Sequence, residues 1–388
     1  MELYMCGFNA HSQLVDQERQ NNENILNFNK VYQSPYIRVR CALWSCTVVE
    51  DDGSLVHRGF RASGLDPVSI DGAPPRNIKT LFGDVSGIIG ALTKNGSIHL
   101  FADDIDQSDG WRLRKHRFDA DNFLSRQNLI IDHIAIADNG EVCICTKMAS
   151  HETTPEDSPT DSPGIPSIEF SPPTARFHIH TFSSVEDLLS SKPPTSTHPI
   201  FAPLRSLCGS ATGFTGLNTT DEVLTFGSAL HPQTLGRTPT PANPAEVPSP
   251  VSFLGGISID KIAAGGWIGA AVSEDRDLYV WGGQAGAAKG LNALPKFSDG
   301  EEVRLVDING GVDVVDVGVG SDHIIALTGD GEVWVTGEGD CGQLGTGTTN
   351  FEENWVRVRG DWEANGRVVS VGCGVWCSWV LVDSRTCL

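Results

Sequence analysis

The chain repeats one short pattern from its first residues to its last. In each copy an apolar residue is followed six positions later by a second apolar residue, with turn-forming residues between them. The complete pairs are Val49/Leu55, Leu92/Ile98, Ile136/Val142, Leu217/Val223, Val272/Leu278 and Leu327/Val333. A further pair is divided between the two ends: Leu381 has no following partner and Leu3 has no preceding one. A repeat split across the termini is what a closed ring requires.

The spacing of the repeat indicates the kind of ring. The second member of each pair recurs every 43 to 55 residues, apart from one interval of 81. Repeats of about 40 to 50 residues built from short strands are typical of β-propellers. The intervening turns predict type I′ hairpins at Asp52-Gly53, Asn95-Gly96, Asn139-Gly140 and Asp330-Gly331. We therefore predict an all-β, seven-bladed β-propeller closed by pairing of the N- and C-terminal strands, with residues 1–388 as a single domain.

Two segments interrupt the repeat. Residues 149–175 are rich in Pro, Ser, Thr and acidic residues. This composition cannot bury a core, so we interpret the segment as a disordered insertion. Its Ser-Pro and Thr-Pro pairs leave two readings open, a phosphorylated segment or a neutral insertion. Residues 231–250 are also Pro-rich and predict an extended connector between blades.

Charge and cysteine content narrow the partners and the compartment. The formal net charge is −21, which argues against direct nucleic-acid binding and favours basic protein partners. The one basic cluster, residues 112–117, is interpreted as a solvated blade edge, with a nucleic-acid or histone-tail contact as the alternative. Of the ten cysteines, Cys6 and Cys145 share a repeat column with large aromatic residues and are predicted to pack in the core. Free thiols without an export signal indicate the nucleus and/or the cytoplasm.

Motifs of catalysis and of membrane insertion are missing from the sequence. No phosphate-binding loop, nucleophile elbow or zinc-hydrolase motif occurs, since the glycine-rich stretch at 337–347 belongs to the repeat. No apolar run approaches the roughly 20 residues that span a bilayer. We therefore expect no enzyme, no cofactor, no metal and no membrane association.

Several stretches resemble the repeat of the regulator of chromosome condensation family. They are LYMCGFNAHSQL (3–14), LYVWGGQAGAAKGL (278–291), GVGSDHIIAL (318–327) and VWVTGEGDCGQLGTG (333–347). The resemblance implies a seven-bladed propeller of four-stranded blades. The overall layout is similar to short, single-domain members of the family that act as chromatin-associated adaptors. Family members commonly bind partners through one propeller face or its rim.

A column of tryptophans is the candidate binding site. Trp44, Trp267 and Trp376 each stand five residues before an apolar anchor, and Asp322 takes the same place in another repeat with His323 beside it. Equivalent repeat positions share one radial place, so these residues are expected around one mouth of the central channel. Tryptophan at an opening is a typical anchor for protein recognition. The alternative is that these side chains plug the ring and help to close it.

These observations favour a non-catalytic protein–protein interaction platform, or scaffold. Its expected partner is a protein, either a chromatin-associated protein or a small GTPase. The alternative function is guanine-nucleotide exchange on a Ran-like small GTPase, the activity of the family's founding member. The basic N-terminal tail of that member is absent here, and the one large insertion does not resemble a rigid wedge, so the sequence favours the platform.

Overall fold

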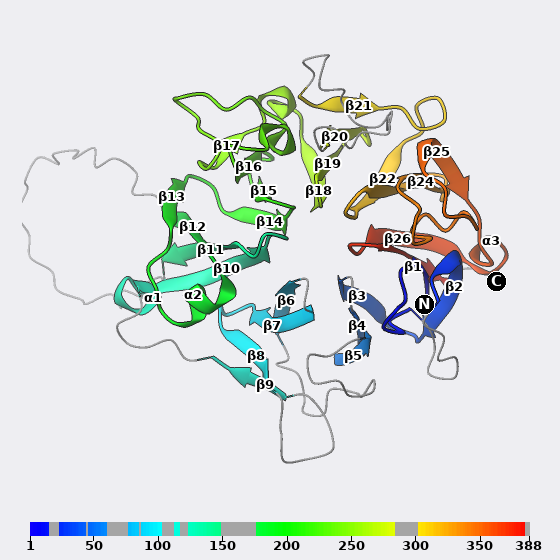
Figure 1. Cartoon of the computed structure of the whole chain (residues 1–388), viewed down its shortest axis with the longest axis horizontal. Helices are drawn as coiled ribbons and strands as arrows, with labels where there is room; N and C mark the ends of the chain where they lie inside the picture. The colour runs from blue at the N-terminus through cyan, green and yellow to red at the C-terminus, as the bar shows by residue number, and fades with distance from the viewer. Residues whose placement is uncertain are drawn as a thin grey trace, which may run out of the picture.

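The computed structural model describes residues 1–14, 23–43, 46–59, 77–84, 87–102, 112–116, 123–148, 176–283 and 302–384. Within these ranges the chain forms seven antiparallel sheets arranged around a central axis (Figure 1). The predicted all-β, seven-bladed propeller is therefore confirmed. The helices of the described part are short, and none is long and apolar enough to cross a membrane.

The first four blades follow one another along the chain. Blade 1 contains β3 (Ile37–Ala42), β4 (Cys46–Asp51) and β5 (Ser54–Gly59). Blade 2 contains β6 (Ile78–Asp84), β7 (Gly87–Thr93), β8 (Ile98–Ala102) and β9 (Arg112–Lys115). Blade 3 contains β10 (Leu129–Ile136), β11 (Val142–Met148), β12 (Phe177–Phe182) and β13 (Ser196–Ile200), with α1 (Phe123–Arg126) and α2 (Val185–Leu189) beside them. Blade 4 contains β14 (Leu204–Gly209), β15 (Gly213–Asn218), β16 (Val223–Gly227) and β17 (Ser249–Pro250), with η1 (Pro232–Leu235).

The remaining blades complete the ring. Blade 5 follows η2 (Ser252–Leu254) and contains β18 (Ile259–Gly265), β19 (Ile268–Ser273), β20 (Leu278–Gly282) and β21 (Arg304–Val306). Blade 6 contains β22 (Val314–Val319), β23 (His323–Thr328), β24 (Val333–Gly337) and β25 (Glu352–Val358). Blade 7 contains β26 (Arg367–Cys373) and β27 (Cys377–Asp383) together with β1 (Glu2–Gly7) and β2 (Ile25–Gln33), and α3 (Trp362–Asn365) precedes β26.

The N- and C-terminal strands close the ring, as predicted. β1 pairs with β27 along its whole length, and Leu3 lies directly opposite Leu381. β2 then pairs with the free edge of β1, so blade 7 takes two strands from each end of the chain. In its core, Trp362 packs edge-on against Tyr4 and Phe28, with ring centroids 5.3 and 5.4 Å apart.

The hairpin turns are mostly of a different type from the predicted one. Only Asp52 and Gly53 both have positive φ, as type I′ requires. At Asn95-Gly96 the glycine alone has positive φ, and its N–H donates to the carbonyl of Thr93. The turns at 137–141 and 328–332 have the same hydrogen bonds. In each of these five-residue turns the fourth residue, a glycine, has the left-handed conformation. An Asn-Gly or Asp-Gly pair identifies a hairpin turn but not its length, because the residues on either side decide how the two strands pair.

One repeat pair and one predicted connector occupy other places than expected. Ile136 and Val142 are opposite each other, but they join the first and second strands of blade 3, whereas the other pairs join second and third strands. Residues 231–250 run from β16 to β17 and so lie within blade 4 rather than between blades. Both errors arise because local composition specifies a turn or an extended loop without its place in the blade. Residues 149–175 lie outside the described residues.

The two cysteines of the predicted packing column are buried, but they do not share one column. Cys6, Phe226 and Trp281 are fully buried on the third strands of their blades, whereas Cys145 is fully buried on the second strand of blade 3. Every cysteine whose side chain the structure describes is a free thiol. These thiols therefore behave as small apolar groups between blades.

The first strand of each blade lies innermost and carries a β-bulge at an equivalent place. The bulged residues are Arg40, Lys79, Asp132, Arg205, Asp260, Val315 and Val369. A bulge redirects a side chain and increases the local twist of the strand. Here it lets a polar side chain of one inner strand reach the inner strand of the next blade.

These contacts form what we call the inner belt, which links neighbouring blades at six successive junctions. From blade 1 to blade 4, Arg40 donates to the carbonyl of Ile78 (3.0 Å), Lys79 pairs with Asp132 (3.0 Å), and His133 Nε2 lies 2.9 Å from the carbonyl of Leu204. From blade 4 to blade 6, Arg205 donates to the carbonyl of Ile259, and Lys261 pairs with Asp316. From blade 6 to blade 7, Asp316 accepts hydrogen bonds from Ser370 Oγ (2.6 Å) and from the Val371 N–H (3.0 Å). The inner belt satisfies polar backbone groups that would otherwise face neighbouring blades unpaired.

We expect deletion of residues 1–14 to open the ring. Without β1, β2 loses its neighbour and the edge of β27 is exposed together with the apolar core of blade 7. The truncated protein should be insoluble or should melt well below the parent in a thermal denaturation experiment. A synthetic peptide of residues 1–14, added in trans, should restore part of the lost stability. A truncated protein that melts like the parent would refute ring closure through β1.

We expect Asp316→Asn to destabilise the fold by roughly 2 kcal/mol, because the buried Asp316 carboxylate accepts two hydrogen bonds from β26 and pairs with the partly exposed Lys261. The amide cannot neutralise Lys261 and accepts fewer hydrogen bonds from Ser370 and Val371. Urea denaturation measures the change. Asp313→Asn, at an exposed position just before β22, is the matched control and should leave the midpoint unchanged. Equal midpoints for both variants would show that the inner belt contributes no stability at this junction.

Candidate functional site

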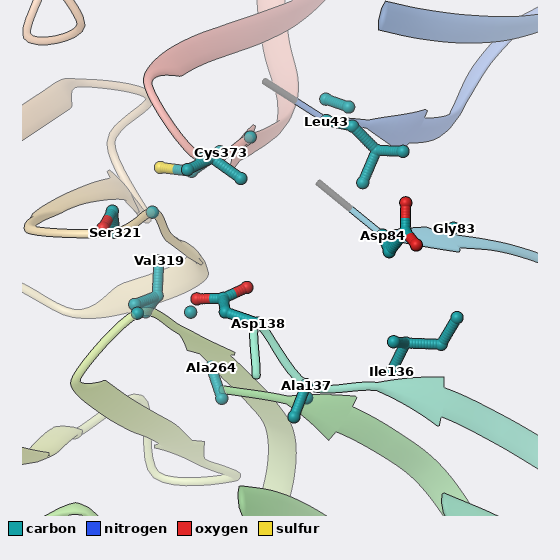
Figure 2. Close-up of a pocket in the computed structure, with 17 residues that line it drawn as sticks. Leu43, Gly83, Asp84, Ile136, Ala137, Asp138, Ala264, Val319, Ser321 and Cys373 are labelled. Atoms are coloured by element: carbon teal, nitrogen blue, oxygen red, sulfur yellow. The ribbon is translucent and has the colours of Figure 1, made fainter. Parts of the chain in front are cut away.

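The first strands of all seven blades end at the same end of the channel, which we call the mouth. They surround a cavity of about 170 Å³. Its walls come from the ends of the seven inner strands and the residues that follow them, including Leu43, Asp84, Asp138, Ser321 and Cys373 (Figure 2). No single blade forms this cavity, so it exists only when the ring is closed.

Backbone contacts between neighbouring turns hold the mouth in place. The Asp138 N–H donates to the carbonyl of Ser210 (3.0 Å), and the Ser321 N–H donates to the carbonyl of Val375 (3.0 Å). Gly266 has a φ of +45°, and a Cβ there would lie 2.0 Å from the carbonyl oxygen of Ser321. Only glycine allows this turn to approach its neighbour so closely. The mouth is therefore built from backbone and is fixed before any partner binds.

The mouth is acidic. Asp84 and Asp138 are the charged residues among the described groups that line the cavity, and Figure 2 shows the Asp138 carboxylate turned toward the open space. Asp138 stays in contact with solvent, but the surrounding walls remove part of its hydration. This desolvation, followed by repulsion from Asp322, raises the pKa of Asp138 above its ordinary value of 3.8.

Trp267 lies on the rim of the mouth in the turn before β19. Its ring is half-buried and packs against His231 from the loop of blade 4, with the centroids 4.7 Å apart. Beside His231, the side chain of Leu230 is 84% exposed. Two neighbouring blades thus present one aromatic and apolar surface on this side of the rim.

Trp376 lies on the rim in the turn before β27. Its side chain is 39% exposed. Phe8, which follows the N-terminal strand β1, packs edge-on against it at 5.6 Å and donates its N–H to the carbonyl of Trp376 (2.9 Å). The closing contact between the two ends of the chain therefore also supports this exposed tryptophan.

Asp322 and His323 are adjacent but differ in access to solvent. Asp322 is exposed at the rim, in the turn before β23. His323 is fully buried, and its Nε2 lies 3.0 Å from Ser378 Oγ of blade 7. Burial lowers the pKa of His323 to about 4, so the ring is neutral at pH 7. Its side chain supports the rim from below and does not reach the surface.

Trp44 lies outside the described residues. The hairpin bonds nevertheless align the blades: Gly320 donates to the carbonyl of His323, Gly374 to that of Cys377, and Leu43 to that of Cys46. Asp322 and Trp376 stand one residue before the accepting position, whereas Trp44 stands two residues before it. The first blade is therefore offset by one residue from the column that the sequence spacing predicted.

The described residues of the mouth contain no metal cluster and no activated thiol. Nowhere in the described ranges do three or more His, Cys, Asp or Glu side chains converge on a point that would hold a metal ion. Cys373 lines the cavity, but burial raises the pKa of its thiol and keeps it protonated. The chemistry that these side chains offer is charge, hydrogen bonding and apolar contact.

Sequence comparisons agree with this geometry. Residues 314–343 match the regulator of chromosome condensation (RCC1) repeat. RCC1 domain-containing protein 1 of Homo sapiens is 27% identical over 199 residues, which cover 42% of this chain and 52% of that protein. E3 ubiquitin-protein ligase HERC2 of Homo sapiens is 35% identical over 147 residues, which cover 37% of this chain and 3% of that protein. The chain thus spans about half of one relative and a small part of the other.

Solved structures resemble the whole ring. Yeast RCC1 (Prp20), in a complex with Kap60, matches with a TM-score of 0.63 and 14% identity over 99% of this chain and 89% of that chain. Prp20p from Saccharomyces cerevisiae, described with its binding properties to Gsp1p and histones, matches with a TM-score of 0.62 and 13% identity over 99% and 92%. Residues 314–343 thus carry an RCC1 repeat, and the whole ring has the fold of these RCC1 propellers. At this level of identity the structural likeness shows the fold alone.

Sequence reasoning missed the residues of this propeller that lie outside the regular repeat columns. Asp138 belongs to the Asp-Asn-Gly stretch that was interpreted only as a hairpin turn. Leu230 lies in the blade 4 loop, which has no counterpart in the repeat pattern. An apolar residue beside histidine and proline in an otherwise polar loop was the one available signal.

We expect Asp138→Asn to stabilise the protein near pH 7. The pKa of Asp138 is raised in the folded state, so the folded state resists its ionisation. Stability is then highest below the ordinary pKa of 3.8 and is lost as the pH rises through the raised value. The gain in the variant should be at most about 1 kcal/mol, as for other solvent-screened charges.

Thermal denaturation between pH 4 and 7 measures the effect of Asp138→Asn. The advantage of the variant should shrink as the pH falls toward 3.8. Asp52→Asn, which removes an exposed carboxylate from a turn at the other end of blade 1, is the matched control. If both variants have the same pH profile, the mouth does not perturb Asp138.

Proposed function

We propose that the protein is a non-catalytic interaction platform that binds a protein partner at the mouth end of its propeller. The observation that carries this proposal is the gathering of exposed aromatic and apolar side chains beside a cavity to which all seven blades contribute. Large aromatic groups that stay partly in water are typical anchors of protein interfaces. In the proposed interface, the rim residues Trp267, Trp376 and Asp322 contact the partner.

The rigid construction of the rim supports this role. Neighbouring turns are hydrogen-bonded to one another, and Trp376 is held by the backbone and ring of Phe8. A surface that is already ordered loses little conformational entropy when a partner binds. His323 positions the rim by bonding to Ser378 of the next blade. Trp44 remains in the proposed site because it stands in the sequence between β3 and β4, the segment of blade 1 that corresponds to the other rim segments, although one residue off their column.

The character of the mouth supports binding rather than catalysis. The described lining groups are backbone, apolar side chains, a serine, carboxylates and a protonated thiol, and His323 is buried and neutral. The proposed partner is a chromatin-associated protein, encountered in the nucleus and/or the cytoplasm. Immunoprecipitation of the intact protein from nuclear and cytoplasmic fractions, followed by mass spectrometry, identifies it.

Nucleotide exchange on a Ran-like small GTPase is the alternative function. It is favoured by the likeness to Prp20p, which was studied for its binding to Gsp1p. We expect the protein to leave the release of a fluorescent nucleotide from a Ran-like GTPase unchanged. Acceleration by several orders of magnitude at catalytic protein concentrations would replace the platform with the exchange function.

We expect Trp376→Ala to weaken partner binding by about 2 kcal/mol or more, as truncation of an interface anchor does. Trp267→Ala should have a similar effect. Affinity for the recovered partner is measured by calorimetry, and the melting temperature of each variant is measured in parallel. Tyr36→Ala removes an aromatic side chain that is 65% exposed at the opposite end of the propeller, and should leave affinity unchanged.

Stability separates the two roles of the tryptophans. If they only pack the ring, truncation should lower the stability of the fold by about 3 to 5 kcal/mol, the usual cost for a buried aromatic residue. If binding is lost only in proportion to the loss of folded protein, the proposal that these tryptophans contact the partner is contradicted. Unchanged affinity for both stable variants would contradict it as well.

A further inference from the structure

Apolar side chains flank the acidic mouth on both sides; those of Leu230 and Trp376 are exposed and that of Trp267 is half-buried. Leu230 and Trp267 lie at blades 4 and 5, and Trp376 lies at blade 7. Asp322 of blade 6 stands between them in ring order, and Asp138 of blade 3 turns into the cavity. From blade 4 to blade 7, the rim residues are therefore first apolar, then acidic, then apolar again.

The apolar surface at blade 4 is held firmly although Leu230 is 84% exposed. Ser228 fixes the turn: its Oγ accepts the Leu230 N–H (3.2 Å), and its carbonyl accepts the His231 N–H (3.2 Å). The buried guanidinium of Arg237 secures the rest of the loop by donating to the carbonyls of Thr225, Asn243, Pro244, Ala245 and Val247 at 3.0 to 3.4 Å. The loop thus keeps an apolar side chain in water.

The two rim carboxylates have no counter-charge within the described part of the chain. Neither Asp138 nor Asp322 forms a side-chain hydrogen bond or an ion pair there, and the two repel each other. The described residues that line the cavity include no Lys, Arg or His. The cavity of about 170 Å³ has room for the end of one long side chain, since a water molecule takes about 30 Å³ in the liquid.

We infer that the mouth docks an extended segment of the protein partner that inserts one lysine or arginine side chain between Asp138 and Asp322. Apolar side chains on either side of that cation contact Leu230 and Trp267 at one end and Trp376 at the other. This inference rests on the proposed function and adds to it the chemistry of the partner.

Charge complementarity selects this occupant. A cation placed between the two carboxylates replaces their repulsion by charge-assisted hydrogen bonds, which are about twice as strong as neutral ones. The partly desolvated mouth screens these bonds less than open water does. An inserted side chain also brings its neighbours onto the exposed rim, so apolar contact and charge act together. The acidic surface as a whole would attract any cation, but it does not combine two carboxylates with apolar side chains on both sides as the mouth does.

Selection from a random library of 12-residue peptides displayed on phage tests the inference directly. The full chain serves as bait at 150 mM salt, where diffuse attraction to the acidic surface is screened. Enriched sequences should carry Arg or Lys with apolar residues on both sides. For a synthetic peptide of the best sequence, replacing that residue by citrulline or acetyl-lysine should weaken binding about tenfold or more, the loss expected for a hydrogen bond to a charged group.

Matched protein variants locate the peptide. Asp138→Asn should weaken binding of the synthetic peptide about tenfold, by the same loss of a charged partner. Leu230→Ala and Trp376→Ala should also weaken it. Asp52→Asn makes the same charge change in an exposed turn at the other end of blade 1, and should leave the affinity unchanged.

The inference is overturned if no sequence is enriched, if enriched peptides lack the cation, or if Asp138→Asn and Asp52→Asn bind the synthetic peptide equally well. Binding that depends on Trp376 but not on Asp138 would retain the platform and reject the inserted cation. Binding of the recovered partner that is insensitive to Trp267 and Trp376 would reject the platform itself.

Discussion

The closed ring of inner strands is the constraint on which the rest of the structure depends. Each inner strand contacts two neighbours, and polar groups that are buried at these junctions must find their hydrogen-bond partners on the adjacent blade. The inner belt meets this requirement near the start of these strands. There the single side chain of Asp316 pairs with Lys261 on β18 and accepts hydrogen bonds from Ser370 and Val371 on β26. Backbone bonds between turns, such as Asp138 to Ser210, meet it at the other end. The channel wall is thus tied at both ends.

This arrangement explains why the candidate site is a property of the ring and not of any one blade. The cavity walls come from turns that are fixed by the next blade, and Trp376 is supported by Phe8 from the opposite end of the chain. A blade taken alone would present its turn without the neighbouring wall. Loss of ring closure should therefore abolish partner binding even where most blades keep their strands.

The sequence was sufficient to predict the fold because the repeat records pairing directly: Leu3 and Leu381 are opposite each other, as are Leu217 and Val223. It was less informative about the site. Repeat position placed His323 at the correct end of the propeller but could not show that its ring turns inward. Asp138 resembled an ordinary turn residue, because its role depends on an Asp322 carboxylate that is distant in sequence. Such juxtapositions follow from closure of the ring and leave no local pattern.

Asp138 and Asp322 have no side-chain partner among the described residues, and this has a physical consequence for the role of the ring. Repulsion between Asp138 and Asp322 favours the open chain, so the closed fold must offset it elsewhere. The inner belt and the paired terminal strands do so at positions away from the mouth. Residues that break local rules of stability in an otherwise consistent fold are typical of functional sites. The same holds for Leu230, which stays 84% exposed in a turn fixed by Ser228. A ring that only needed to be stable would have no use for either feature, and this favours recognition at the mouth over simple packing.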